Sequence, residues 1–159
     1  MKTKRAGFSK ELRLSGASAT EALGARIASG LGPGVGVALE GDLGAGKTTL
    51  ARAILGALGV AGAVPSPTFT LVQCYETAKF PVRHYDLYRI EREAELDELG
   101  LDEALDEGAV LIEWPERAGA RLPEDVLRVK LSILQGDARI AVVSGPAHWA
   151  KIFESAHAQ

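Results

Sequence analysis

The stretch that decides the fold is LEGDLGAGKTTLAR, at residues 39–52. Within it, residues 41–48 spell G-x-x-x-x-G-K-T, the pattern of a loop that points its backbone N–H groups at phosphate groups. The motif requires a strand before it and a helix after it. VGVALE, at 35–40, is a short apolar run typical of a buried parallel strand, and residues 47–58 repeat leucine and isoleucine at helical spacing. The sequence therefore predicts a strand, a phosphate-binding loop and a helix, in that order.

Each residue type in the loop has a physical reason. Gly41, Gly44 and Gly46 permit backbone conformations and close approaches that a Cβ would prevent. Lys47 supplies a compact positive charge to the β- and γ-phosphates, and Thr48 offers a hydroxyl to Mg²⁺. The helix that follows adds the positive end of its dipole. The motif predicts binding of a nucleoside triphosphate, but kinases, GTPases and ATPases share it.

Two carboxylates are candidates for the roles that a phosphate loop leaves open. Hydrolysis needs an acid that holds Mg²⁺ and a group that places the attacking water, usually at the carboxyl end of a neighbouring strand. The apolar run AVLIEW leads into Glu113, and HYDLYR supplies Asp86 in a similar position. We predict Glu113 for the metal and Asp86 for the metal shell or the water. Two alternatives stay open: Glu113 as an ordinary polar residue at a strand end, and Asp86 as an acid bonded to its own backbone. His84 lies on the same face as Asp86, and a packed imidazole is the favoured interpretation.

Strand and helix patterns alternate along the rest of the chain, which predicts an α/β fold. SKELRL near the start is typical of an edge strand, and SATE, at 18–21, has capping-box spacing that predicts a helix running to Leu31. Strands are expected within 69–75 and 82–88, and one or two short acidic helices within 91–107. VLRVKLSIL and ARIAVVS flank QGD and predict a late hairpin, so part of the sheet should be antiparallel. The tail is expected to end in a helix.

The composition is that of an ordinary globular protein, with 159 residues, 47% hydrophobic and 25% charged, and a net charge of −3. This length is typical of one domain, so we expect residues 1–159 to form a single domain. The acidic balance argues against autonomous binding of nucleic acid. One cysteine, Cys74, excludes an internal disulfide and a site with several thiolate ligands. Because the sequence has no membrane-spanning run and no signal peptide, a cytoplasmic location is expected.

Three further features carry open alternatives. PSPTF, at 65–69, offers the hydroxyls of Ser66 and Thr68 in a loop stiffened by two prolines, which could sense a γ-phosphate or serve only as a connector. Trp114 could stack on a base or pack in a subunit contact, with core packing as the default. Arg89 could neutralise phosphate charge or pair with the acidic stretch.

Five motifs, taken together and in order, resemble those of one family. With GDLGAGKTTL, SPTFTLV, HYDLYR, ELGLDE and LIEWPER, the chain is similar to the TsaE family (also YjeE) of bacterial ATPases for threonylcarbamoyladenosine modification of tRNA. The resemblance covers roughly residues 18–123, and the SPTF, DLYR and EWPE motifs are far more specific than the phosphate loop. It implies a P-loop NTPase-like three-layer α/β sandwich around a central mixed β-sheet.

The resemblance also implies chemistry and partners. It implies binding of ATP or ADP with Mg²⁺ and slow ATP hydrolysis, in support of the partner proteins TsaB and TsaD rather than in the transfer step itself. tRNA would be reached only through this complex, and no membrane is involved. Thr48 and Glu113 would hold Mg²⁺, and Asp86, Glu113 and Lys47 would be the catalytic residues. The nucleotide-binding positions would be Thr20, Gly41, Gly44, Ala45, Gly46, Lys47, Thr48, Thr49, Ser66 and Thr68.

Two other classes of function are compatible with a phosphate loop. A stand-alone small-molecule kinase would need an acceptor pocket and usually an arginine-rich lid, and no such lid segment follows the loop in the sequence. A nucleotide-sensing assembly module would use bound ATP rather than its hydrolysis. The ATPase subunit of the tRNA-modifying complex is therefore the predicted function, and the other two are alternatives.

Overall fold

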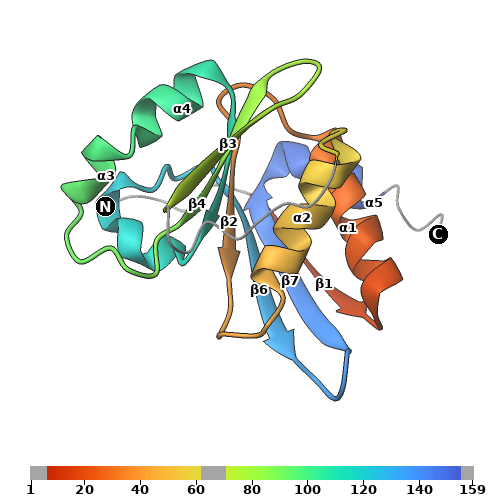
Figure 1. Cartoon of the computed structure of the whole chain (residues 1–159). Helices are drawn as coiled ribbons and strands as arrows, with labels where there is room; N and C mark the ends of the chain where they lie inside the picture. Colours follow the sequence, from red (N-terminus) through yellow and green to blue (C-terminus); the bar gives the residue numbers. More distant parts are fainter. Residues whose placement is uncertain (1–6, 62–70, 155–159) are drawn as a thin grey trace.

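A seven-stranded sheet forms the centre of the molecule, seen here in a computed structural model that describes residues 7–61 and 71–154 (Figure 1). Its strands are β1 (Gly7–Leu14), β2 (Gly36–Glu40), β3 (Val72–Glu76), β4 (Pro81–Asp86), β5 (Ala109–Glu113), β6 (Leu127–Ile133) and β7 (Arg139–Pro146). They lie in the order β1-β7-β6-β2-β5-β4-β3. The central strand β2 pairs in parallel with β5 and β6, and β4 pairs in parallel with β5. The pairs β1–β7, β6–β7 and β3–β4 are antiparallel, which confirms the predicted mixed sheet.

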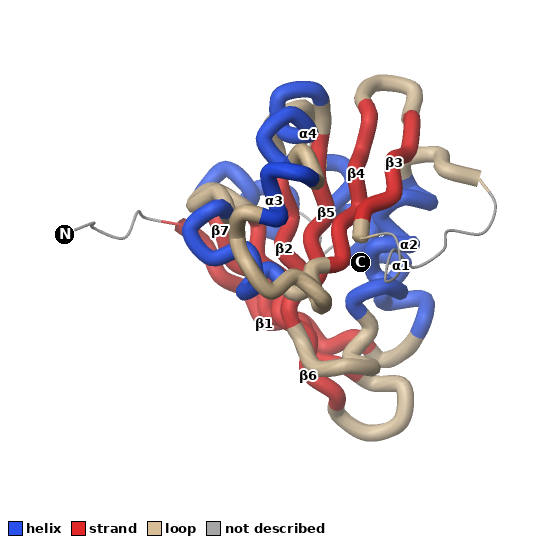
Figure 2. Tube along the Cα trace, turned by 60° about the vertical axis from the view of Figure 1, so that its left-hand side comes forward, coloured by secondary structure: helices blue, strands red, loops and turns tan. Residues whose placement is uncertain are grey.

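Helices cover both faces of the sheet and so make three layers (Figures 1 and 2). One face carries α1 (Ala17–Ser29), α2 (Lys47–Ala57) and α5 (Ala150–Glu154). The opposite face carries α3 (Glu95–Glu98), α4 (Leu101–Glu107) and the 3₁₀ helix η1 (Pro115–Arg121). A second short 3₁₀ helix, η2 (Ala147–Trp149), leads into α5. Within the described ranges, every helix is too short or too polar to cross a membrane.

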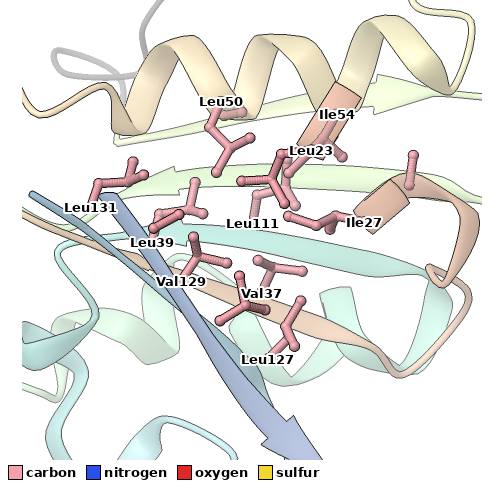
Figure 3. Close-up of a cluster of buried hydrophobic side chains, with 14 of the residues drawn as sticks. Leu23, Ile27, Val37, Leu39, Leu50, Ile54, Leu111, Leu127, Val129 and Leu131 are labelled. Carbon is pink, nitrogen blue, oxygen red and sulfur yellow. The ribbon is translucent and has the colours of Figure 1, made fainter. Parts of the chain in front are cut away.

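Side-chain alternation along the strands divides the hydrophobic core between the two faces. On the face of α1 and α2, the apolar stripes of both helices meet one side of the central strands (Figure 3). The residues labelled there are Leu23, Ile27, Val37, Leu39, Leu50, Ile54, Leu111, Leu127, Val129 and Leu131. The other side of β5, with Val110 and Ile112, packs against α3, α4 and η1. Each such side chain stabilises the fold by about 1.5–3 kcal/mol relative to exposure, so α2 is firmly anchored on the sheet.

The capping box predicted at residues 18–21 is wrong. Helix α1 begins at Ala17, its N-cap is Gly16, and no side chain caps it. The backbone N–H of Thr20 already donates to the carbonyl of Gly16 at 3.2 Å, so the first turn closes before Ser18 could act as a cap. The helix also ends at Ser29 rather than at Leu31.

The other element predictions agree with the structure more closely. SKELRL lies in the edge strand β1, the helix after the phosphate loop ends within one residue of its predicted end, and the late hairpin is β6–β7. The acidic stretch forms the two short helices α3 and α4. The 3₁₀ helix η1, which follows β5 directly, has no counterpart among the elements predicted from the sequence.

Candidate functional site

The phosphate loop, residues 41–46, joins the carboxyl end of β2 to the start of α2. Its three glycines all have positive φ, at 146° for Gly41, 82° for Gly44 and 109° for Gly46. A Cβ at Gly41 would lie 2.7 Å from the carbonyl oxygen of Leu131, so the loop passes too close to β6 for any larger residue. No side chain caps α2 at Gly46. The N–H groups of its first turn therefore face the loop without a side-chain partner, as an anion site requires.

Lys47 is the first residue of α2, and it is only 5% exposed. Its Nζ donates hydrogen bonds to the carbonyl oxygens of Gly41 at 2.6 Å and Asp42 at 3.0 Å. Burial lowers the pKa of this ammonium group, and the nearby carboxylates of Glu113 and Asp86 oppose that shift. The charge is thus held by backbone carbonyl groups of the loop itself, which are weaker acceptors than the oxygens of a phosphate group.

Thr48 and Glu113 are 65 residues apart in sequence but form a direct hydrogen bond. The hydroxyl of Thr48 lies 3.0 Å from Oε1 and 2.9 Å from Oε2 of Glu113. The parallel pairing of β2 and β5 places Leu39 opposite Glu113, so both strands end at the same edge of the sheet. Hydroxyl and carboxylate oxygens are the ligands that Mg²⁺ prefers, together with phosphate oxygens. The residues present therefore fit a Mg²⁺ ion shared between the protein and a nucleotide.

The strand β4 brings a second carboxylate to this edge, because Asp86 pairs with Glu113 in the parallel register. Asp86 is buried, and its Oδ1 accepts the backbone N–H of Tyr88 at 3.0 Å. This local bond is the alternative that the sequence left open for Asp86, and it coexists with a position beside Glu113. His84, two residues earlier, is fully buried, and its Nε2 lies 2.7 Å from Oε2 of Glu113. The imidazole is packed, as expected, but it also contacts the predicted metal ligand.

Trp114, directly after β5, lies at the rim of the phosphate loop. Its backbone is left-handed, with φ 59° and ψ 51°, which is uncommon for a residue with a side chain. The indole packs on the ring of Tyr88, with centroids 4.9 Å apart, and the Nζ of Lys47 lies 4.3 Å from the indole centroid. The aromatic face therefore helps to hold the lysine that the motif assigns to phosphate binding.

Comparison with known proteins identifies the family of this chain. Residues 14–141 match the family model described as threonylcarbamoyl adenosine biosynthesis protein TsaE. The chain belongs to the TsaE family. Among its relatives, a protein of Rickettsia felis is 39% identical over 133 residues, which cover 83% of this chain and 78% of the relative. A protein of Bacillus subtilis is 39% identical over 121 residues, which cover 76% of this chain and 75% of the relative. Both carry the name tRNA threonylcarbamoyladenosine biosynthesis protein TsaE.

The fold also matches a solved structure. The crystal structure of YdiB from Bacillus subtilis superposes with a TM-score of 0.80 at 28% sequence identity, and the match covers 98% of this chain and all of YdiB. The predicted membership of the TsaE family and the predicted fold class are both confirmed.

Four of the predicted site residues of this TsaE-family chain meet at one edge of the sheet: Lys47, Thr48, Asp86 and Glu113. The other predicted nucleotide-binding positions lie in the phosphate loop, in the first turn of α1 or α2, or outside the described residues. Thr49 is exposed in the first turn of α2. Thr20 lies in the first turn of α1, where its hydroxyl donates to the carbonyl of Gly16 at 3.4 Å rather than to the loop. Ser66 and Thr68 lie outside the described residues. The roles of all these residues stay predictions.

Sequence reasoning missed Arg139, at the start of β7. Its guanidinium group donates to the loop carbonyl oxygens of Ala45 at 3.0 Å and Gly44 at 3.3 Å. It also donates to the hairpin carbonyl oxygens of Gly136 at 2.9 Å and Ala138 at 3.0 Å. Arg139 therefore ties the phosphate loop to the β6–β7 hairpin of this TsaE-family fold. An arginine 94 residues from the loop carries no local signal of this role, which only the sheet order creates.

Proposed function

We propose that this chain is the Mg²⁺-dependent ATPase subunit of the bacterial complex that makes threonylcarbamoyladenosine in tRNA. Membership of the TsaE family supports the pathway, because the curated relatives are named for that biosynthesis. The observation that carries the ATPase part is the hydrogen-bonded pair of Thr48 and Glu113 beside Lys47. Phosphoryl chemistry needs a phosphate-binding loop, side chains that can hold Mg²⁺ and a lysine, and the proposed site combines all three at one edge of the sheet.

Each residue has a proposed task in hydrolysis. Lys47 exchanges its bonds to the loop carbonyl groups for bonds to the β- and γ-phosphates. Thr48 and Glu113 hold Mg²⁺, which when bound neutralises charge on the phosphate oxygens. Asp86, in register beside Glu113, orients the attacking water or accepts its proton. The N–H groups of the loop and of the first turn of α2 receive the phosphate oxygens.

We further propose that the partners are TsaB- and TsaD-type proteins, and that tRNA is reached through them. The net charge of −3 supports this division, because a chain that grips tRNA by itself would normally be basic. The chain would hydrolyse ATP slowly alone and at a changed rate in the complex. Its ATP would sustain turnover of the transferase partner rather than the transfer step.

The test is the ATPase rate of the purified chain with and without both partners and tRNA. We expect a weak rate alone and a clear change when the partners are added. An unchanged rate, together with no detectable binding to either partner, would overturn the proposal. The variant Glu113→Ala separates hydrolysis from sensing. It should keep the fold and lose Mg²⁺-dependent nucleotide binding or turnover, and full partner function without turnover would favour the assembly module instead.

One observation supports a small-molecule kinase as a second candidate function. A cavity of about 520 Å³ adjoins the phosphate loop, with Asp42 and Trp114 on its wall and Lys130 of β6 in its lining. Such a cavity offers room for an acceptor beside the phosphate loop. Radiolabelled phosphate that moves from ATP to a metabolite, rather than to water, would support a kinase, and release of inorganic phosphate alone would support the ATPase.

A further inference from the structure

His84 is a fully buried polar residue, packed within the sheet. It lies in β4 on the same side of the sheet as Val82, which belongs to the hydrophobic core under α1 and α2. Its neighbour in the parallel register is Leu111 of β5. A leucine or methionine would fill such a site without any polar atom to satisfy. Packing alone therefore does not explain why this position carries an imidazole.

The hydrogen bonding of the imidazole ring indicates a role toward Glu113. Nε2 lies 2.7 Å from Oε2 of Glu113, and since an ionised carboxylate only accepts, Nε2 carries the hydrogen of this bond. Nδ1 is buried and has no partner among the described residues. An unsatisfied buried polar atom costs about 1–3 kcal/mol, so the ring is retained at a cost to stability. The only polar contact of the ring within the described ranges is the carboxylate of Glu113.

The carboxylate of Glu113 is thus held from two sides. His84 of β4 donates to Oε2, and Thr48 of α2 donates to both oxygens. The hydroxyl of Thr48 is itself a metal ligand in the proposed site, so its oxygen has a second task. The imidazole has none, and its single bond fixes the rotation of the carboxylate group. Groups that hydrogen-bond a ligating carboxylate in this way fix its orientation toward the metal.

We infer that His84 is a positioning residue, which orients the Glu113 carboxylate for Mg²⁺ and so sets the affinity for the metal–nucleotide pair. The inference rests on the proposed function, since it assigns a support to the proposed metal ligand. The proposed role acts through the Glu113 carboxylate alone, and His84 is not proposed as a ligand of the metal or of the nucleotide.

Two amide variants of His84 make a matched test. His84→Gln places its side-chain N–H₂ group near the position of Nε2 and keeps a donor within reach of Glu113. His84→Asn ends one carbon earlier, near the position of Nδ1, and falls short. Both variants are polar and uncharged, so they share most of the cost to the fold. Val82→Ala, on the same strand and face, serves as a control that weakens the core and leaves Glu113 untouched.

The readout is equilibrium binding of a fluorescent ADP analogue, titrated with Mg²⁺, beside the thermal midpoint Tm. We expect His84→Asn to raise the half-saturating Mg²⁺ concentration about 10- to 100-fold, the range for lost outer-shell partners of a metal ligand. His84→Gln should recover most of the wild-type value. Val82→Ala should lower Tm and leave the Mg²⁺ dependence as in the wild type.

Equal half-saturating Mg²⁺ concentrations for the Asn and Gln variants and the wild type would overturn the inference. A shift that follows Tm across all three variants would also overturn it, since a merely structural role predicts that correlation. A wild-type chain whose nucleotide binding ignores Mg²⁺ would instead overturn the proposed function, so the two failures are distinguishable.

Discussion

Arg139 offers the sharpest test of how the fold shapes the phosphate loop. Its guanidinium group reaches the loop from β7 and donates to the carbonyl oxygens of Gly44 and Ala45. Gly44 has a φ of 82°. Because glycine populates negative φ about as readily as positive φ, this residue alone does not fix the loop conformation. With these two carbonyl groups held by Arg139, the loop is kept in the conformation that we propose receives the phosphate groups. Arg139→Gln removes both restraints and so lowers the population of that arrangement.

The size of the effect follows from the two bonds. A hydrogen bond from a charged donor contributes about 1.5–3 kcal/mol when well made and buried. Arg139 is only half-buried, and one of the two bonds is 3.3 Å long. The pair therefore contributes about 1–2 kcal/mol to the loop conformation, which corresponds to roughly a 5- to 30-fold loss of nucleotide affinity.

The assay is isothermal titration with Mg²⁺–ADP, with Arg13→Gln as the matched control. Arg13 lies exposed on the neighbouring edge strand β1, so its loss removes the same charge without touching the loop. We expect the control to bind within about twofold of the wild type at physiological salt, where distant surface charges are screened. Arg139→Lys keeps the charge but loses the fork, and should resemble Arg139→Gln. Wild-type affinity in both Arg139 variants would refute the reasoning.

Three further outcomes are expected. Lys47→Ala should abolish measurable ATP affinity in a binding titration, and normal binding would mean that the site is elsewhere. Because burial lowers the pKa of Lys47, the unfolded chain binds more protons there just below pH 10.5. The free energy of urea unfolding should therefore shift in favour of the wild type over Lys47→Met as pH rises through that window. Gly24→Ala should destabilise the fold by about 1–3 kcal/mol, since its Cβ would lie 2.5 Å from that of Ala53 in the α1–α2 contact. Gly56→Ala, with open space at its Cβ inside α2, should instead stabilise by about 0.5–1 kcal/mol, and denaturant melts of both variants test this contrast.

The sequence could predict those parts of the site that depend on residues adjacent in the chain. Gly41 to Thr48 carry their own geometry, because left-handed glycines and a helix start are local properties. Glu113 and Asp86 could be placed at one edge because parallel strands end together, and a polar residue after a buried apolar run marks that end. The family resemblance then indicated which class of phosphate-loop protein this is, because the phosphate loop alone does not distinguish kinases, GTPases and ATPases.

The supports of the site could not be predicted, because they depend on sheet order and side-chain packing. Nothing local distinguishes Arg139 from other strand arginines, and its role exists only because the hairpin β6–β7 lies beside the loop. The sequence favoured a packed role for His84, and its contact with Glu113 depends on β4 pairing with β5. The false capping box has a similar origin, since Gly16 and Thr20 close the first turn of α1 before Ser18 can cap it.

The charges around the loop give a reason why nucleotide and metal should bind together. The ammonium group of Lys47 interacts electrostatically with four nearby carboxylates, those of Asp42, Asp86, Glu113 and Glu116. Two of these, Asp86 and Glu113, are buried and adjacent in the sheet register. A triphosphate that arrived alone would add negative charge beside the four carboxylates that act on Lys47. A divalent cation that enters with it would offset part of this charge, so we expect the protein's own carboxylates to add to the Mg²⁺ dependence of nucleotide binding.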